Sequence, residues 1–84
     1  MNGDNTLSGT VTDDNDSPLA GVAVSAVQNG EDAGGATTGS DGTYSMSVDP
    51  TMEAVVTFRL GGYVTYVANA DAGATSLDAT LQRA

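Results

Sequence analysis

The spacing of the apolar residues constrains this chain most. Apolar and polar side chains alternate one for one in short segments rich in Val, Thr and Tyr, and each segment ends at Gly, Asp, Asn or Pro. No long stretch carries apolar groups at the helical spacing of three and four residues without a Gly, a Pro or a β-branched run interrupting it. The pattern therefore predicts an all-β chain.

Seven segments fit the alternating pattern and are predicted to be strands. Turns rich in Asp, Gly and Asn separate them at the regular spacing that is typical of a β-sandwich. The predicted strands are residues 7–12, 22–27, 36–39, 44–48, 54–60, 63–69 and 77–82, and residues 31–35 are expected to form a loop. The predicted fold class is a seven-stranded antiparallel β-sandwich.

The inward-facing positions of these strands predict the core. Phe58 lies in the most apolar segment and is expected at its centre. Tyr63, which follows two glycines, is expected to fold over the open end of the sandwich and to place its hydroxyl on a backbone partner. The predicted core residues are Leu7, Val11, Leu19, Val22, Val24, Tyr44, Met46, Val56, Phe58, Leu60, Tyr63, Leu77 and Leu81.

Charge and size limit the functions open to the chain. Eleven acidic residues against two arginines give a net charge of −9, which repels nucleic acid and anionic lipid. The absence of Cys, His and Lys excludes thiol, imidazole and Schiff-base chemistry as well as zinc fingers. A chain of 84 residues has no room for both a core and a deep cleft, so glycosidase-like carboxylate pairs among Glu31, Asp32, Asp41 and Glu53 are not expected. We expect neither an enzyme nor a cofactor.

The same composition leaves alternatives open for the state of the chain. Leu, Val and Phe make up 15 of the 84 residues and Ile is absent, which together with the charge is typical of intrinsic disorder. The prediction of a fold therefore rests on the alternating pattern. Adaptation to high salt also explains an acidic surface and a core of small residues, and an ordinary acidic extracellular module is the competing interpretation. No apolar run is long enough for a membrane-spanning helix, so no membrane insertion by this domain itself is expected.

Five short motifs follow one another in a specific order. They are GTVTD at 9–13, SPLAGVAV at 17–24, TGSDGTY at 38–44, GGY at 61–63 and LDATL at 77–81. In this order they resemble the carboxypeptidase regulatory-like domain, a family of transthyretin-like (prealbumin-like) sandwiches with Greek-key topology. The resemblance covers about residues 7–81 and implies that residues 1–84 are a single domain excised from a larger protein.

The resemblance also implies a function. Domains of this family sit beside carboxypeptidase catalytic domains, precede the plug of TonB-dependent outer-membrane receptors, or occur in series in secreted and cell-surface proteins. We therefore expect a non-catalytic accessory or spacer module that is extracellular, periplasmic or associated with the outer membrane. Its expected partners are the neighbouring domains of the parent chain, and a surface glycan or a protein is a further candidate. The isopeptide bond of the related B-type surface domain is excluded, because the chain has no lysine.

Two features keep a binding function open as the alternative. Asp13, Asp14 and Asp16 offer oxygen ligands of the kind that calcium prefers, although an EF-hand register is broken and the same residues also favour an ordinary turn. Tyr66, with Tyr63 as a second aromatic, is the candidate platform for stacking on a sugar ring. The alternative function is a calcium- or carbohydrate-binding β-sandwich module.

Overall fold

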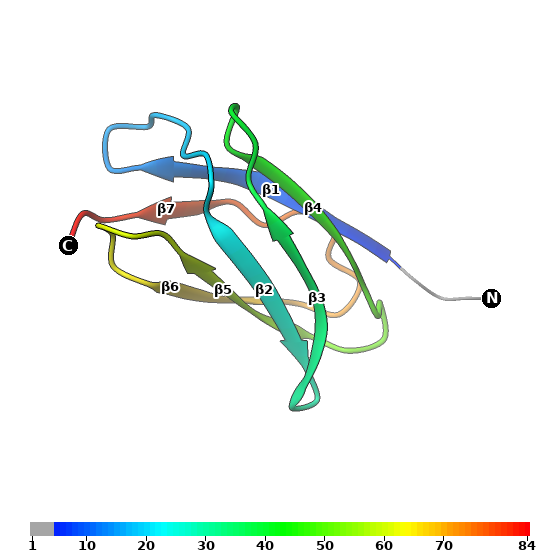
Figure 1. Cartoon of the computed structure of the whole chain (residues 1–84). Helices are drawn as coiled ribbons and strands as arrows, with labels where there is room; N and C mark the ends of the chain where they lie inside the picture. The colour runs from blue at the N-terminus through cyan, green and yellow to red at the C-terminus, as the bar shows by residue number, and fades with distance from the viewer. Residues whose placement is uncertain (1–4) are drawn as a thin grey trace.

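The computed structural model describes residues 5–84, which form two β-sheets packed face to face (Figure 1). The strands are β1 (Asn5–Asp13), β2 (Ala23–Gln28), β3 (Glu31–Thr37), β4 (Thr43–Val48), β5 (Ala54–Arg59), β6 (Tyr66–Ala70) and β7 (Ala79–Leu81). One sheet has the order β4-β1-β7 and the other β3-β2-β5-β6. The predicted all-β sandwich of seven strands is confirmed. Within residues 5–84, no helix has the length and hydropathy needed to cross a membrane.

The first and last strands pair in parallel. Val11 lies opposite Ala79 and Asp13 opposite Leu81, whereas the other ladders between named strands of the described chain are antiparallel. The prediction of a wholly antiparallel sandwich was wrong for this pair. The chain leaves β6 in one sheet and crosses to the other through residues 71–78, so that β7 enters beside β1 and runs in the same direction (Figure 1). The start of β1 and the end of β7 consequently lie at opposite ends of the sandwich.

The third strand is longer than the sequence pattern indicated. β3 begins at Glu31, directly after Asn29 and Gly30, so the loop predicted for residues 31–35 was wrong. Asn29 and Gly30 both have positive φ (54° and 79°), as a two-residue hairpin turn requires. A register shift then accommodates one extra residue, since Ala26 faces Gly34 while Val27 faces Asp32. This β-bulge breaks the alternation from which the strand should have been recognised.

The core fills the space between the sheets as the alternation predicted. Phe58 is completely buried, and its ring packs edge-on against Tyr44 with centroids 5.7 Å apart. Three residues expected in the core, Leu60, Tyr63 and Leu77, are only partly buried and pack against its margin. The buried positions that the prediction omitted are mainly alanines, which let the two sheets approach closely: Ala26, Val48, Ala54, Ala70 and Ala79.

The chain end and the segment before β6 pair with each other. The amide of Val64 donates to the carbonyl of Gln82 at 2.8 Å, and the amide of Ala84 donates to the carbonyl of Gly62 at 3.0 Å. Tyr63 forms an antiparallel bridge with Arg83 between these bonds. The ladder between β5 and β6 starts with Phe58 opposite Tyr66, and the amide of Tyr63 donates to the carbonyl of Leu60 in the turn between them, so β6 begins three residues later than predicted.

Candidate functional site

The acidic turn after β1 is organised around the carboxylate of Asp13. Its Oδ1 accepts hydrogen bonds from the amides of Asn15 at 2.8 Å and Ser17 at 3.0 Å. The amide of Ser17, followed by that of Asn15, holds the pKa of Asp13 below its usual value. Its Oδ2 lies 3.9 Å from Nη2 of Arg83 near the other end of the chain. The carboxylate therefore stabilises the turn and is largely occupied by protein donors.

The other acidic residues of this turn face solvent. Asp14 and Asp16 are both exposed, and Asp16 has a positive φ of 64°, which Asp tolerates better than most residues. Residues 5–84 contain no group of three or more Asp, Glu, His or Cys side chains close enough to hold a metal ion. The structure thus does not gather Asp13, Asp14 and Asp16 around one point, and calcium binding stays a prediction for solution measurement.

Two further carboxylates also serve turns. Oδ1 of Asp41 accepts from the hydroxyl of Thr43 at 2.7 Å, and Oδ1 of Asp49 accepts from the hydroxyl of Thr51 at 2.6 Å. These hydroxyls, together with the amides of the same threonines, lower the pKa of each carboxylate. The remaining loop carboxylates considered for acid–base chemistry are exposed: Glu31, Asp32 and Glu53.

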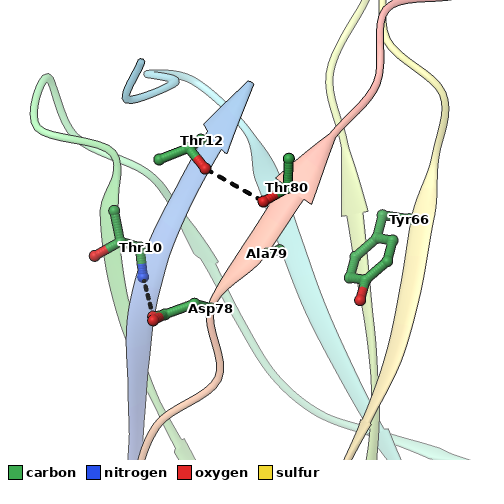
Figure 2. A pocket seen from close by; sticks show the side chains of 6 residues that line it. All are labelled: Thr10, Thr12, Tyr66, Asp78, Ala79 and Thr80. Carbon is green, nitrogen blue, oxygen red and sulfur yellow. Dashed lines mark hydrogen bonds between the residues drawn. The ribbon is translucent and has the colours of Figure 1, made fainter. Parts of the chain in front are cut away.

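The most developed cluster of polar side chains lies where β1 meets β7. Oδ1 of Asp78 accepts from the amide of Thr10 at 2.9 Å, and the hydroxyls of Thr12 and Thr80 lie 3.4 Å apart (Figure 2). With Ala79, and with Tyr66 of β6 on the opposite side, these residues line an open hollow of about 400 Å³. The ring of Tyr66 packs against Phe58 on one side and remains 40% exposed. The hollow offers hydroxyl groups, one carboxylate and one aromatic ring.

A buried tyrosine anchors the segment that leads into β7. The hydroxyl of Tyr44 donates to the carbonyl of Leu77, and burial, with a smaller contribution from the charge of Asp78, raises the pKa of Tyr44 to about 12. Gly9 makes this contact possible, because a Cβ at this position would collide with the same carbonyl oxygen. We had expected Tyr63 to make the hydroxyl-to-backbone bond, and the structure assigns it to Tyr44 instead.

Sequence reasoning identified Tyr66 as a candidate but missed its polar neighbours. Two short segments each have polar residues on either side of an apolar one, which indicates outward-facing polar side chains on two strands. They are Thr10-Val11-Thr12 and Asp78-Ala79-Thr80. That signal was visible in the sequence. Only the parallel register, which places Thr12 opposite Thr80, shows that the two outward faces adjoin. We call β1 together with residues 75–83 the β1–β7 seam.

Comparison with known proteins identifies the family. The sequence profile of the carboxypeptidase regulatory-like domain matches residues 6–82. The chain belongs to this family. A search of curated proteins for relatives of this carboxypeptidase regulatory-like domain finds no match. Family membership confirms the resemblance drawn from the five motifs, and it supports the role of an accessory module in a larger protein.

Two solved structures show where the fold of this carboxypeptidase regulatory-like domain recurs. Chlorocatechol 1,2-dioxygenase from Pseudomonas putida superposes with a TM-score of 0.70 at 12% identity, over 95% of this chain and 60% of the dioxygenase chain. A 9R-lipoxygenase from Cyanothece PCC8801 superposes with a TM-score of 0.53 at 15% identity, over 95% of this chain and 16% of the lipoxygenase chain. At such identities the likeness concerns the fold alone. The chain spans only part of each of these longer proteins.

Proposed function

We propose that this domain is a non-catalytic accessory module that acts as an in-line spacer within a larger secreted or outer-membrane protein, of the carboxypeptidase or TonB-dependent-receptor type. The observation that carries the proposal is the parallel pairing of β1 with β7, because it directs the chain into the sandwich at one end and out at the other. The longest dimension of the molecule, 39 Å, is well above its other dimensions of 23 and 16 Å. Neighbouring domains of the parent chain are therefore the partners, held apart along one line.

The charge distribution supports a module that stays separate from its neighbours. The net charge of −9 disfavours nucleic acid and anionic membrane surfaces as partners. The carboxylates with assigned hydrogen bonds in turns, those of Asp13, Asp41 and Asp49, stabilise the fold and are not arranged around a substrate cleft. An extracellular, periplasmic or outer-membrane-associated location is the compartment that we propose for such an acidic, cysteine-free module.

A distance measurement tests the in-line geometry. The chain has no cysteine, so cysteines introduced at the exposed positions Thr6 and Gln82 carry the only spin labels. Seven residues separate Thr6 from Asp13, which lies opposite Leu81, and a strand rises about 3.4 Å per residue, so we expect a narrow distance distribution near about 25 Å. A distribution centred below about 15 Å, less than five residues of strand, would place both ends on the same side and refute the spacer.

Replacement in the parent protein tests the role itself. An unrelated sandwich domain with the same end-to-end span should preserve the host's activity, since a spacer contributes length and stiffness rather than chemistry. A flexible Gly/Ser linker of 84 residues should not preserve it. If the linker works as well as the native module, the spacer function is wrong.

The hollow beside Tyr66 favours carbohydrate binding as a second candidate function. Tyr66, which is 40% exposed, lines the same hollow as three threonines and one carboxylate, and this combination suits a neutral sugar ring, which stacks on an aromatic face and exchanges hydrogen bonds with polar groups. Titration of ¹⁵N-labelled protein with neutral oligosaccharides should shift the amides of Thr12, Tyr66 and Thr80. The Tyr66→Ala variant should lose these shifts, and Val67→Ala, on the other face of β6, should retain them. Equal responses of the two variants would remove this candidate.

A further inference from the structure

We propose that the β1–β7 seam is a mechanical clamp, which holds the module folded when tension is applied through the two ends of the chain. The inference rests on the proposed in-line spacer, because only a module joined at both ends transmits tension. It adds a property that spacing alone does not require. The clamp consists of β1, the segment 75–83 and the hydrogen bonds between them.

The direction of the strands determines how the seam is loaded. Tension on the N-terminal side pulls β1 backward along its own axis, and tension on the C-terminal side pulls β7 forward along the same axis (Figure 1). Parallel neighbours that are pulled in opposite directions are sheared. In shear the hydrogen bonds of a ladder are stretched together, whereas strands peeled from one end lose their bonds one at a time. The forced unfolding rate is set by the barrier to this first separation.

Hydrogen bonds connect β1 with residues 75–81 along most of the strand. The amide of Ser8 donates to the carbonyl of Thr75 at 3.0 Å, and the amide of Leu77 donates to the carbonyl of Ser8 at 2.9 Å. The bond from the amide of Thr10 to Asp78 continues the series at 2.9 Å. The regular parallel ladder follows, from Val11 opposite Ala79 to Asp13 opposite Leu81. Side chain and backbone bonds thus follow one another with no long unpaired interval.

Further contacts oppose sliding of the C-terminal segment. Tyr44, on the strand at the other side of β1, donates its hydroxyl to the carbonyl of Leu77. The pairing of residues 82–84 with residues 62–64 holds this segment against the connection between β5 and β6. Val11 and Leu81, on the inner side of the seam, are completely buried, so water reaches the ladder only from its outer side. Any sliding of β7 must break these contacts in the same step.

Single-molecule force spectroscopy in two pulling directions tests the clamp. In the shear direction, handles are fused to the two ends of the full chain. In the peel direction, one handle is attached to a cysteine introduced at the exposed Asn15, just after β1, and the other to the C-terminus, so that β1 and β7 are pulled apart from the same end. Both measurements use the chain that carries this cysteine, so the fold and its stability are the same in the two pulling directions. We expect the unfolding force in shear to be at least about twofold higher than in peel at equal loading rate, because the seam's hydrogen bonds are stretched together in shear and break one at a time in peel. The force reports the unfolding barrier and not the equilibrium stability.

Two matched variants test whether the seam itself bears the load. Asp78→Ala removes the side-chain bond to Thr10 within the seam, and Thr51→Ala removes a comparable bond to Asp49 in the loop between β4 and β5. We expect Asp78→Ala to lower the ratio of shear force to peel force and Thr51→Ala to leave it unchanged. Equal forces in the two directions, or equal ratios for the two variants, would overturn the clamp. The spacer would survive that result if the Thr6–Gln82 distance remains near its expected value, so the two proposals fail separately.

Discussion

Replacement of Phe58 by alanine should remove most of the stability of this domain. Phe58 has no exposed surface and lies at the middle of the core, where its ring contacts Tyr44 at 5.7 Å and Tyr66 at 5.9 Å between centroids. Both neighbouring rings come from different strands, so the cavity left by the substitution would have walls from β4, β5 and β6. Backbone hydrogen bonds hold each of these strands in its sheet, so the strands cannot move far enough to fill the cavity.

The expected magnitude is comparable to the entire free energy of unfolding. Truncation of a buried Phe lowers the free energy of unfolding by about 3–5 kcal/mol. Loss of the edge-on aromatic contact is included in this value or adds slightly to it. For 84 residues, a total stability of roughly 0.05–0.15 kcal/mol per residue amounts to about 4–13 kcal/mol. If the free energy of unfolding falls by about 1 kcal/mol per molar urea, the urea concentration at the unfolding midpoint should fall by about 3–5 M. The variant should be partly or wholly unfolded without denaturant.

Urea titration followed by far-ultraviolet circular dichroism measures this shift, with Val67→Ala as control. Val67 is 55% exposed on β6, so its truncation should change the free energy of unfolding by less than about 0.5 kcal/mol. The reasoning would be refuted if Phe58→Ala shifted the midpoint by no more than Val67→Ala does. In that case the two sheets would not be packed around Phe58 as described.

Four other measurements test separate parts of the structure. In urea titration, Gly9→Ala should lower the free energy of unfolding by at least about 1–3 kcal/mol, because the new Cβ collides with the Leu77 carbonyl. Gly61→Ala should lower it much less, because the space around Gly61 is open. Folding lowers the pKa values of Asp13, Asp41 and Asp49, so the stability that these carboxylates contribute is complete above about pH 4 and is lost as the pH falls through the folded pKa values. Thermal melts should show the melting temperature falling in this range, and the Asp13→Asn variant should show a smaller fall. Sub-millimolar calcium should leave the melting temperature unchanged at matched ionic strength, and a rise of many degrees would instead establish a calcium site. The melting temperature should rise with sodium chloride up to about 1 M, where the Debye length is about 3 Å. A plateau above that concentration indicates an ordinary acidic module, whereas a continued rise to about 3 M indicates salt adaptation. A melting temperature that falls on the first addition of salt contradicts the electrostatic argument.

The parts of the fold that follow from local pattern were predictable from the sequence. Alternation placed Val56 and Phe58 inward on β5 and Val55 outward, since side chains on a strand alternate by necessity. The sharp reversal at Gly42 was also expected, and its φ of 77° together with the close approach of the Val11 carbonyl explains why glycine is needed there. These features depend on residues close together in the chain, so a single sequence contains them.

The predictions failed where a distant segment decides the local conformation. Tyr63 looked like the start of a strand of the second sheet, but it forms a bridge with Arg83, and the ladder with β5 starts only at Tyr66. The Gly- and Ala-rich residues before Ala36 have weak strand propensity, and pairing with β2 nevertheless makes them part of β3. The side chain of Gln28 is another example, because it bonds to the backbone of Asp49 and Met52 and thereby holds a loop about twenty residues away. Alternation carries no information about such partners.

The parallel register of the β1–β7 seam joins residues 68 positions apart, and both proposals about function depend on it. Its physical origin lies in three residues that are unremarkable in isolation. Gly9 leaves space for the chain at Leu77, Tyr44 holds the Leu77 carbonyl in that space, and the next residues then continue beside β1 as β7. A side chain at position 9 would push the incoming segment away from β1 before the ladder could begin. The direction in which the chain leaves the sandwich is therefore set at a contact near the middle of β1, and the ability to act in line with neighbouring domains depends on the packing of that contact as much as on the strands themselves.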